Sequence, residues 1–195
     1  MSFELLVYKP VMIKEGVFYS KVTLNDSDIN IQVDKNKLII DADKNKAILD
    51  VDSKTSKHIN RISEELIKQT SEKSEKWFGK PINLKDCKTL YQSALVDNVK
   101  LHCFYDENSR FYERKNNDVQ HNELNKELNG ISLIKCAYVI FTKSSFFIRW
   151  EIMQFKIKND LDTKIIDYSI RDLDEHEISL DTHKKFKKDI PISLF

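Results

Sequence analysis

The chain has 195 residues, with 32 Lys and Arg against 31 Asp and Glu, so its formal net charge is only +1. This length suits one domain, or one domain with an appendage, and is enough to bury a hydrophobic core, which excludes a small disulfide-stabilised scaffold. With 41% hydrophobic residues, 3 Gly and 3 Pro, the composition also excludes a disordered or collagen-like chain.

The first third of the chain predicts a meander of antiparallel strands. Hydrophobic and polar residues alternate from Ile29 to Val33, the period of a half-buried strand, and similar Asp-Lys-Asn-Lys segments follow at 34–37 and 43–46. Because Asn tolerates the left-handed turn conformation, we expect a turn at each segment. The predicted strands cover residues 4–9, 17–24, 29–33, 38–42 and 47–51.

A helical pattern replaces the strands after residue 53. Ile59, Ile62 and Leu66 recur at helical spacing, Ser56 is a candidate N-cap, and Gly79 is followed closely by a proline, which supplies a stop. These signals predict a helix of about five or six turns. A second, short helix is predicted to start at Asn83, and the residues on one of its faces are Leu84, Cys87, Tyr91 and Ala94.

Strands are predicted again in the last part of the domain. Segments 99–105 and 110–115 flank Asp106-Glu107-Asn108-Ser109, which is a hairpin signal. The polar segment 116–129 is expected to be a loop with a helical turn that ends at Gly130. Two further strands, joined by Lys143-Ser144-Ser145, are predicted at 131–142 and 146–158.

The last predicted strand changes its hydrophobic face partway along. Ile148, Trp150 and Ile152 share one parity, whereas Met153 and Phe155 share the other, as does Ile157. The switch predicts a β-bulge or a strand that bends around a barrel. From residue 159 onward the periodicity fades into a charged tail.

The N-terminal residues and the cysteines bear on the compartment. Residues 1–6 include the acidic Glu4 and lack the pattern of a signal peptide, and the most apolar segment, 131–141, contains Lys135, which fits a buried strand. The three cysteines are too few and too widely spaced for a disulfide framework or a zinc knuckle. We therefore expect a soluble, non-secreted protein in a reducing intracellular compartment, with no membrane partner.

The charge is unevenly distributed along the chain. Residues 1–53 hold 7 basic and 9 acidic groups, residues 54–158 hold 19 and 13, and residues 159–195 hold 6 and 9. The middle is therefore basic, at +6, and the tail is net acidic. Within the tail, an acidic stretch at 160–182 precedes a short basic cluster, Lys184 to Lys188.

Aromatic residues concentrate in the basic middle. Ten of the 20 lie between residues 101 and 155, and neighbours such as Phe104-Tyr105, Phe111-Tyr112 and Phe146-Phe147 place one ring on each face of a strand. Exposed rings interleaved with Lys and Arg are typical of single-stranded nucleic-acid binding, in which bases stack and cations neutralise phosphates. The alternative is that the rings, Trp77 and Trp150 included, form a barrel core. The candidate nucleic-acid contacts are Trp77, Lys80, Lys100, Phe104, Arg110, Phe111, Arg114, Lys143, Phe147, Arg149 and Trp150.

Catalytic motifs are weak by comparison. Three isolated glycines cannot form a nucleotide-binding loop, and the five histidines lack ligand spacing. Two i, i+2 pairs of aspartates resemble the acidic pairs that hold metal ions in nucleases, but they also fit the solvent face of an edge hairpin. These aspartates are Asp41, Asp43, Asp50 and Asp52.

The order of elements points to a family. The long helix ends in Trp77-Phe78-Gly79-Lys80, Leu90-Tyr91 lies in the short helix, and the last two strands carry Tyr138, Phe141, Trp150 and Gln154. Over roughly residues 20–158 this arrangement resembles the OB-fold single-stranded-DNA-binding proteins of nucleocytoplasmic large DNA viruses, which are related to small phage replication proteins of the same fold.

The resemblance implies a five-stranded barrel that covers displaced strands in DNA replication, recombination and repair. It also implies an acidic tail that competes with DNA and recruits replication proteins. The stretch 160–181 and the terminal Phe195 match that tail in outline, whereas the basic cluster Lys184 to Lys188 departs from it.

We therefore expect a mainly β (α+β) protein. Residues 1–158 are predicted to form an OB-fold-like antiparallel β-barrel with a helical insert at about 56–95, followed by a charged tail at 159–195. The predicted function is non-enzymatic, sequence-tolerant binding of single-stranded DNA without metal or cofactor. One alternative is a viral structural or assembly protein with a β-sandwich and protein interfaces. The other is a metal-dependent nuclease that uses the four aspartates.

Overall fold

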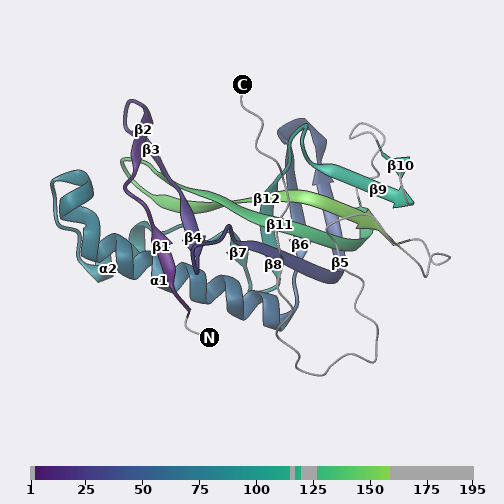
Figure 1. Ribbon diagram of the computed structural model, residues 1–195, viewed down its shortest axis with the longest axis horizontal. Helices are drawn as coiled ribbons and strands as arrows, with labels where there is room; N and C mark the ends of the chain where they lie inside the picture. The colour runs from purple at the N-terminus through teal and green to yellow at the C-terminus, as the bar shows by residue number, and fades with distance from the viewer. Residues whose placement is uncertain (1–2, 115–116, 120–126, 159–195) are drawn as a thin grey trace.

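The computed structural model describes residues 3–114, 117–119 and 127–158. Its strands surround one hydrophobic core, and a long helix runs along one side (Figure 1). The α-helices among these residues are α1 (Ser53–Phe78) and α2 (Leu84–Leu90). The strands are β1 (Leu5–Val7), β2 (Val11–Lys14), β3 (Val17–Ser20), β4 (Val22–Leu24), β5 (Asn30–Asp41), β6 (Lys46–Asp50), β7 (Leu95–Val96), β8 (Lys100–Phe104), β9 (Arg110–Arg114), β10 (Asn117–Asp118), β11 (Glu127–Phe141) and β12 (Phe146–Ile157).

Five strands close into a ring in the order β5, β6, β8, β12, β11 and back to β5. Each neighbouring pair is antiparallel except β8 and β12, which are parallel and meet at Phe104 and Glu151. This closed ring is consistent with an OB-like barrel. The remaining strands extend it: β3 and β2 continue from β11, β9 and β10 lie beside β12, and β1 pairs with β4. The protein is thus mainly β, but the barrel is not a clean one.

Helix α1 is inserted between β6 and β8 and is longer than predicted. Asp52 is its N-cap, because its carboxylate accepts a hydrogen bond of 2.6 Å from the Thr55 amide. The predicted N-cap, Ser56, lies inside the helix and is buried. The end is as predicted: Gly79 adopts a left-handed conformation with φ of 69°, which residues with a side chain adopt only at a cost.

Helix α1 carries its apolar stripe toward the barrel and toward strand β1. Ile59, Ile62 and Leu66 are buried on that stripe. Gln69, also buried, accepts a hydrogen bond from the amide of Val7 and donates one to the carbonyl of Leu5. The side-chain amide of Gln69 therefore satisfies the edge of β1 that faces the helix.

The two Asp-Lys-Asn-Lys segments have different structures. The second forms a turn as predicted, with Asn45 in the left-handed conformation. The first does not, because β5 runs through it without interruption. There Lys35 has a positive φ of 50° and the pairing with β11 shifts register, so the strand contains a bulge instead of a turn. Asn36 points inward, donates to the carbonyl of Val33 and accepts from the hydroxyl of Ser132.

The predicted hairpin between 99–105 and 110–115 is also wrong. Strands β8 and β9 form at these positions, but they do not pair with each other. Both lie parallel to β12, at successive positions along it. The buried hydroxyl of Ser109 helps to hold the connection there by donating to the carbonyl of Ile152 over 2.7 Å.

The β-bulge predicted in the last strand is confirmed. Leu133 pairs with Gln154 and Ile134 with Ile152, so Met153 is the extra residue of β12. Ile152 before it and Phe155 after it are both buried, because the bulge restores the inward orientation. Gly130, expected at the end of a loop, lies instead inside β11.

The cysteines lie in the core, as predicted, and all three are free thiols. Burial raises the pKa of Cys136 to about 12 and also raises the pKa of Cys87 and Cys103. Neither described helix combines the length and the apolar character that crossing a membrane requires. The predicted tail, residues 159–195, lies outside the described residues.

Candidate nucleic-acid interface

Five aromatic and basic side chains meet on the outer face of the barrel. The guanidinium of Arg149 lies 4.1 Å from the ring centre of Phe104 and 5.8 Å from that of Tyr138. The ammonium of Lys46 lies 5.6 Å from the Phe104 ring, and the rings of Tyr19 and Tyr138 meet edge to face at 6.1 Å. We call these five residues the outer strip. It crosses β6, β8, β12, β11 and β3.

Strand pairing explains why the outer strip forms. Residues paired across neighbouring strands point to the same face of a sheet. Lys46 pairs with Phe104, Phe104 with Glu151, and Tyr138 with Arg149. The alternate residues of the same strands point into the core, and they include Ala47, Cys103, Val139 and Trp150.

Each ring of the outer strip offers surface to a ligand. Phe104 and Tyr138 are half-buried and Tyr19 is 39% exposed. Such rings are held by neighbours yet leave surface on which a base can stack. The cations beside them match the phosphates that accompany a base.

A carboxylate competes for Arg149. Glu151 lies two residues along β12 on the same face, and its Oε1 accepts a hydrogen bond of 2.6 Å from Nε of Arg149. The two side chains are only 25% and 23% exposed, so the pair is partly shielded from water. The hydrogen bond to Glu151 uses Nε, so the other two guanidinium nitrogens are the ones that can donate to a phosphate. The outer strip thus carries two cationic side chains, and Glu151 partly neutralises the charge of one of them, Arg149.

The structure brings together part of the predicted contact set. Phe104 and Arg149 are in direct contact, and Phe147 lies on the same side of β12, half-buried. Lys100 is exposed at the other end of β8, on the same face as Phe104. These four residues lie on two adjacent strands of the ring and are compatible with one bound strand.

Two predicted contacts belong to the core instead. Phe111 and Trp150 are each 1% exposed, so neither can stack on a base without opening the barrel. Phe111 packs edge to face against Tyr105 at 5.9 Å. Tyr112, next to it, is also buried, so this aromatic pair leaves no exposed ring. The alternation of residues along a strand separates its two faces, but it does not show whether other parts of the protein bury both of them.

The other predicted contacts lie away from the outer strip. Trp77 is half-buried near the end of α1 and contacts the Phe141 ring at 6.2 Å, while Lys80 and Lys143 are exposed beside a pocket near that end. Arg110 is exposed on β9. Arg114 ends the same strand, and its side chain lies outside the described residues.

Lys46, Tyr19 and Tyr138 belong to the outer strip but were not among the predicted contacts. One available signal was parity: Lys46 is the first residue after the Asn45 turn and alternates with the buried Ala47. The pairing of β6 with β8, which brings Lys46 to Phe104, was not readable from the sequence. Neither was the packing of Tyr19 against Tyr138, more than 100 positions away.

The aspartates of the nuclease alternative are engaged elsewhere. The Asp41 carboxylate pairs with Lys44 at 2.9 Å, and Asp52 caps α1. Asp50 is half-buried on β6, and the side chain of Asp43 lies outside the described residues. Within the part of the chain that the structure describes, no group of three or more potential metal ligands gathers.

Comparisons with known proteins give a family and one distant structural likeness. Residues 34–176 match the model of a family of unknown function, DUF5871. None of the curated proteins matches the sequence. Among solved structures, the chain is similar to the single-stranded DNA-binding protein from bacteriophage Enc34 in complex with ssDNA. The identity is 12%, the TM-score is 0.42, and the alignment covers 78% of this chain and 96% of that chain. A likeness of this size says nothing of what this chain binds.

Proposed function

The chain belongs to the family of unknown function DUF5871, and we propose that it binds single-stranded DNA across the outer strip, without preference for sequence. The observation that carries the proposal is the contact of Arg149 with the Phe104 ring, beside Tyr138. Rings on which a base can stack therefore lie beside cations that can pair with its phosphate, on the same face of the barrel. Base stacking on an aromatic side chain contributes roughly 1–3 kcal/mol and depends little on which base is present.

The position of the outer strip in the ring supports the same function. In OB-type barrels, oligonucleotides bind over the second and third strands and the loops beside them. If β5 counts as the first strand of the ring, β6 and β8 are the second and third, and they carry Lys46 and Phe104. The proposed site therefore lies where a barrel of this kind offers its binding face.

Fluorescence anisotropy with labelled single-stranded and duplex oligonucleotides at two salt concentrations tests the proposal. We expect tighter binding to the single strand, and weaker binding as salt rises. Phe104→Ala should weaken binding about 5- to 150-fold, the loss of one stacked base. Tyr8→Ala removes a 43% exposed ring outside the outer strip and serves as the matched control. Equal affinity for both oligonucleotides, or equal effects of the two variants, would refute the proposal.

The proposal extends to the tail and to biological context. We propose that the protein protects displaced strands during replication, recombination and repair, and that residues 159–195 regulate access to the outer strip and recruit replication proteins. The reason is charge: the tail holds 6 basic and 9 acidic groups, whereas residues 54–158 carry a net +6. Deletion of residues 159–195 should tighten DNA binding at low salt. Unchanged or weaker binding would contradict regulation by competition.

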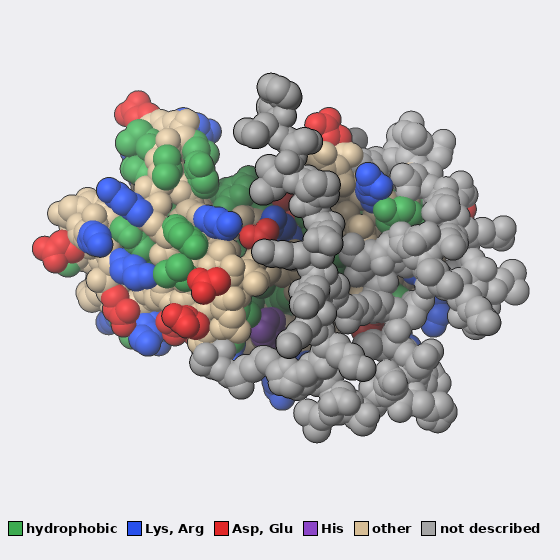
Figure 2. Space-filling model, in the orientation of Figure 1, with side chains coloured by type: hydrophobic (Ala, Val, Ile, Leu, Met, Phe, Trp, Pro, Cys, Tyr) green, Lys and Arg blue, Asp and Glu red, His purple; other side chains and the backbone are tan. Residues whose placement is uncertain are grey.

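A second candidate function, self-association or assembly, is favoured by one observation. The hairpin of β2 and β3 projects from the molecule and bears apolar side chains on its surface (Figure 2). Val11, Met12 and Ile13 of β2 are 55 to 59% exposed. Exposed apolar patches on an edge strand are typical of protein interfaces. A stable higher oligomer that lacks DNA affinity would favour this function over DNA binding.

A further inference from the structure

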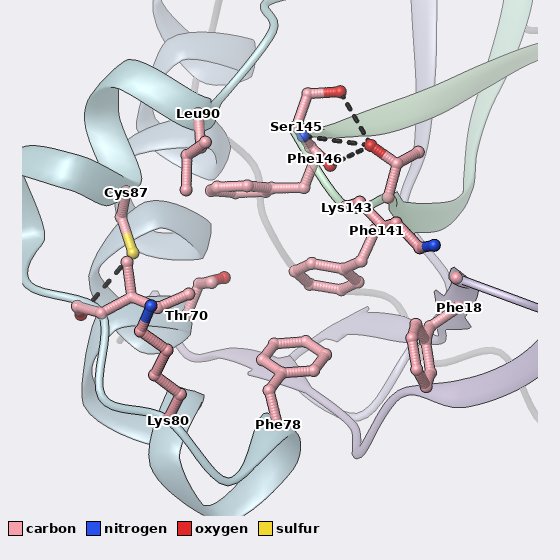
Figure 3. A pocket seen from close by; sticks show the side chains of 13 residues that line it. Phe18, Thr70, Phe78, Lys80, Cys87, Leu90, Phe141, Lys143, Ser145 and Phe146 are labelled. Atoms are coloured by element: carbon pink, nitrogen blue, oxygen red, sulfur yellow. Dashed lines mark hydrogen bonds between the residues drawn. The ribbon is translucent and has the colours of Figure 1, made fainter.

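A pocket of about 270 Å³ lies on the opposite side of β11 from the outer strip. Its walls come from the end of α1, from α2, from β3 and from the turn between β11 and β12 (Figure 3). The volume is slightly below the roughly 300–1,000 Å³ of pockets that hold drug-sized ligands. It therefore suits a small ring system with one or two substituents.

The interior of the pocket is aromatic. The ring of Phe141 stacks against that of Phe146 at 5.4 Å with an angle of 19° between their planes, and it contacts the ring of Phe78, also at 5.4 Å. Phe146 is 3% and Phe141 is 4% exposed, so their contacts hold them in place. Phe18 and Phe78 also line the pocket, are half-buried and meet edge to face at 5.8 Å. These two held rings leave aromatic surface that a planar ligand can contact at little cost in side-chain entropy.

One buried polar atom in the wall has no partner. Thr70 lines the pocket from α1 and is only 2% exposed, and within the part of the chain that the structure describes its Oγ1 makes no hydrogen bond. An unpartnered buried hydroxyl is costly, and native proteins seldom keep one without a reason. A ligand with a donor or acceptor on its edge would satisfy it.

Two lysines flank the opening. Lys80 extends from the end of α1 and Lys143 from the turn between β11 and β12, on opposite sides of the pocket (Figure 3). Gly16 leaves room for the Lys143 stem, because a Cβ at position 16 would lie 2.7 Å from Lys143 Cε. Two ammonium groups beside an aromatic interior are suited to a ligand that joins a ring to an anion.

We propose that this pocket binds a terminal base of the single strand that crosses the outer strip, with its phosphate between Lys80 and Lys143. The inference rests on the proposed function and deepens it. Nucleotides combine a flat heterocycle, polar edge atoms and a phosphate, which match the three features of the pocket. An anion whose ring has no polar edge atoms would match the lysines and the aromatic walls, but it would leave the Thr70 hydroxyl without a partner.

The geometry allows one strand to reach both places. Tyr138 of the outer strip is three residues from Phe141 along β11, and Arg149 is three residues from Phe146 along β12. At about 3.3 Å per residue, each separation is about 10 Å. The turn that carries Lys143 joins the two strands at this end. Because the pocket lies on the other side of β11, a single strand would reach it from the outer strip by passing around this turn.

The test uses the full chain and oligonucleotides that carry one 2-aminopurine, at the 5′ end, at the 3′ end or in the middle. Binding should change the fluorescence of one end label more than that of the middle label, because only that end enters the pocket. Thr70→Val should abolish this difference and weaken binding of the strand about fivefold, the value of one hydrogen bond. It should also raise the melting temperature, because the unpartnered hydroxyl is gone. Thr89→Val, on the exposed part of α2, is the matched control.

A second pair of variants tests the lysines. Lys80→Ala with Lys143→Ala should reduce the slope of log affinity against log salt by about 0.7, the contribution of the one phosphate that the two lysines hold. Lys85→Ala with Lys88→Ala removes the same charge from α2 outside the pocket. If the strand binds but pocket and control variants behave alike, the pocket proposal is refuted and the outer strip stands. If no strand binds at all, both proposals are refuted.

Discussion

Replacing Glu151 with Gln should strengthen DNA binding. Glu151 accepts a hydrogen bond of 2.6 Å from Nε of Arg149 and holds that guanidinium beside the Phe104 ring. Its negative charge both neutralises Arg149 and repels phosphate. Gln keeps the size and the acceptor oxygen, so Arg149 stays in place while its full charge becomes available.

The expected changes in stability and affinity follow from the burial of the Arg149–Glu151 pair. Both side chains are about three-quarters buried, at 25% and 23% exposure. Ion pairs near a surface contribute about 0.2–1 kcal/mol to stability, so the variant should lose at most about 1 kcal/mol of its unfolding free energy. For a chain of this size that loss lowers Tm by about 2–4 °C. The freed charge should steepen the salt slope of binding by about 0.7 and raise affinity about fivefold at low salt.

Anisotropy titrations with a labelled single strand over a series of salt concentrations measure both numbers. Glu127→Gln is the matched control, because it removes the same charge from an ion pair with Lys37 (2.7 Å) at the far end of β11. We expect Glu127→Gln to change affinity little. Weaker binding by Glu151→Gln, or equal gains for the two variants, would show that Arg149 does not contact phosphate.

Three further predictions concern stability and reactivity. Gly130→Ala should lower Tm by several degrees, since the added Cβ would lie 2.0 Å from the Lys156 carbonyl and overpacking costs about 1–3 kcal/mol; an unchanged melting curve would contradict it. Asp52→Ala should cost about 0.5–2 kcal/mol near neutral pH. The hydrogen bond from the Thr55 amide holds the pKa of the Asp52 carboxyl below its ordinary value, so its contribution is present above about pH 4 and is lost as pH falls through the lower folded pKa. The Tm deficit of the variant should therefore shrink in acid, and a constant deficit would refute this assignment. Burial raises the pKa of Cys136 to about 12, so a thiol reagent at pH 8 should label Cys136 only after denaturation; rapid labelling of the native protein would contradict this.

Local patterns in the sequence predicted the elements whose causes are local. The parity switch between Ile152 and Phe155 predicted the bulge at Met153, because inward and outward positions alternate strictly in a strand. Gly79 predicted the end of α1, and Asn45 the turn before β6. In each case the backbone conformation is set by a residue and its immediate neighbours.

Features set by distant partners were not predictable in this way. The segment around Asn36 looks like a turn, but its amide is satisfied inside the barrel by Ser132, which is 96 positions away, so the strand continues through a bulge. Likewise β8 and β9 join β12 instead of each other. The outer strip depends on these pairings. Phe104 and Arg149 were therefore predictable from their residue types, whereas Lys46 and Tyr19 were not.

The parallel contact of β8 with β12, where Phe104 meets Glu151, has a thermodynamic consequence. This contact is one residue pair long. Phe104 belongs to the outer strip, and Glu151 accepts the hydrogen bond from Arg149. Local opening of the barrel at this seam would separate Phe104 from Arg149 and dismantle the site. A ligand that spans both side chains binds only the closed state, so it must shift the opening equilibrium toward closure by mass action. Amide exchange at Phe104, the β8 residue that pairs with β12, therefore reports occupancy of the site. It should slow in proportion to ligand concentration.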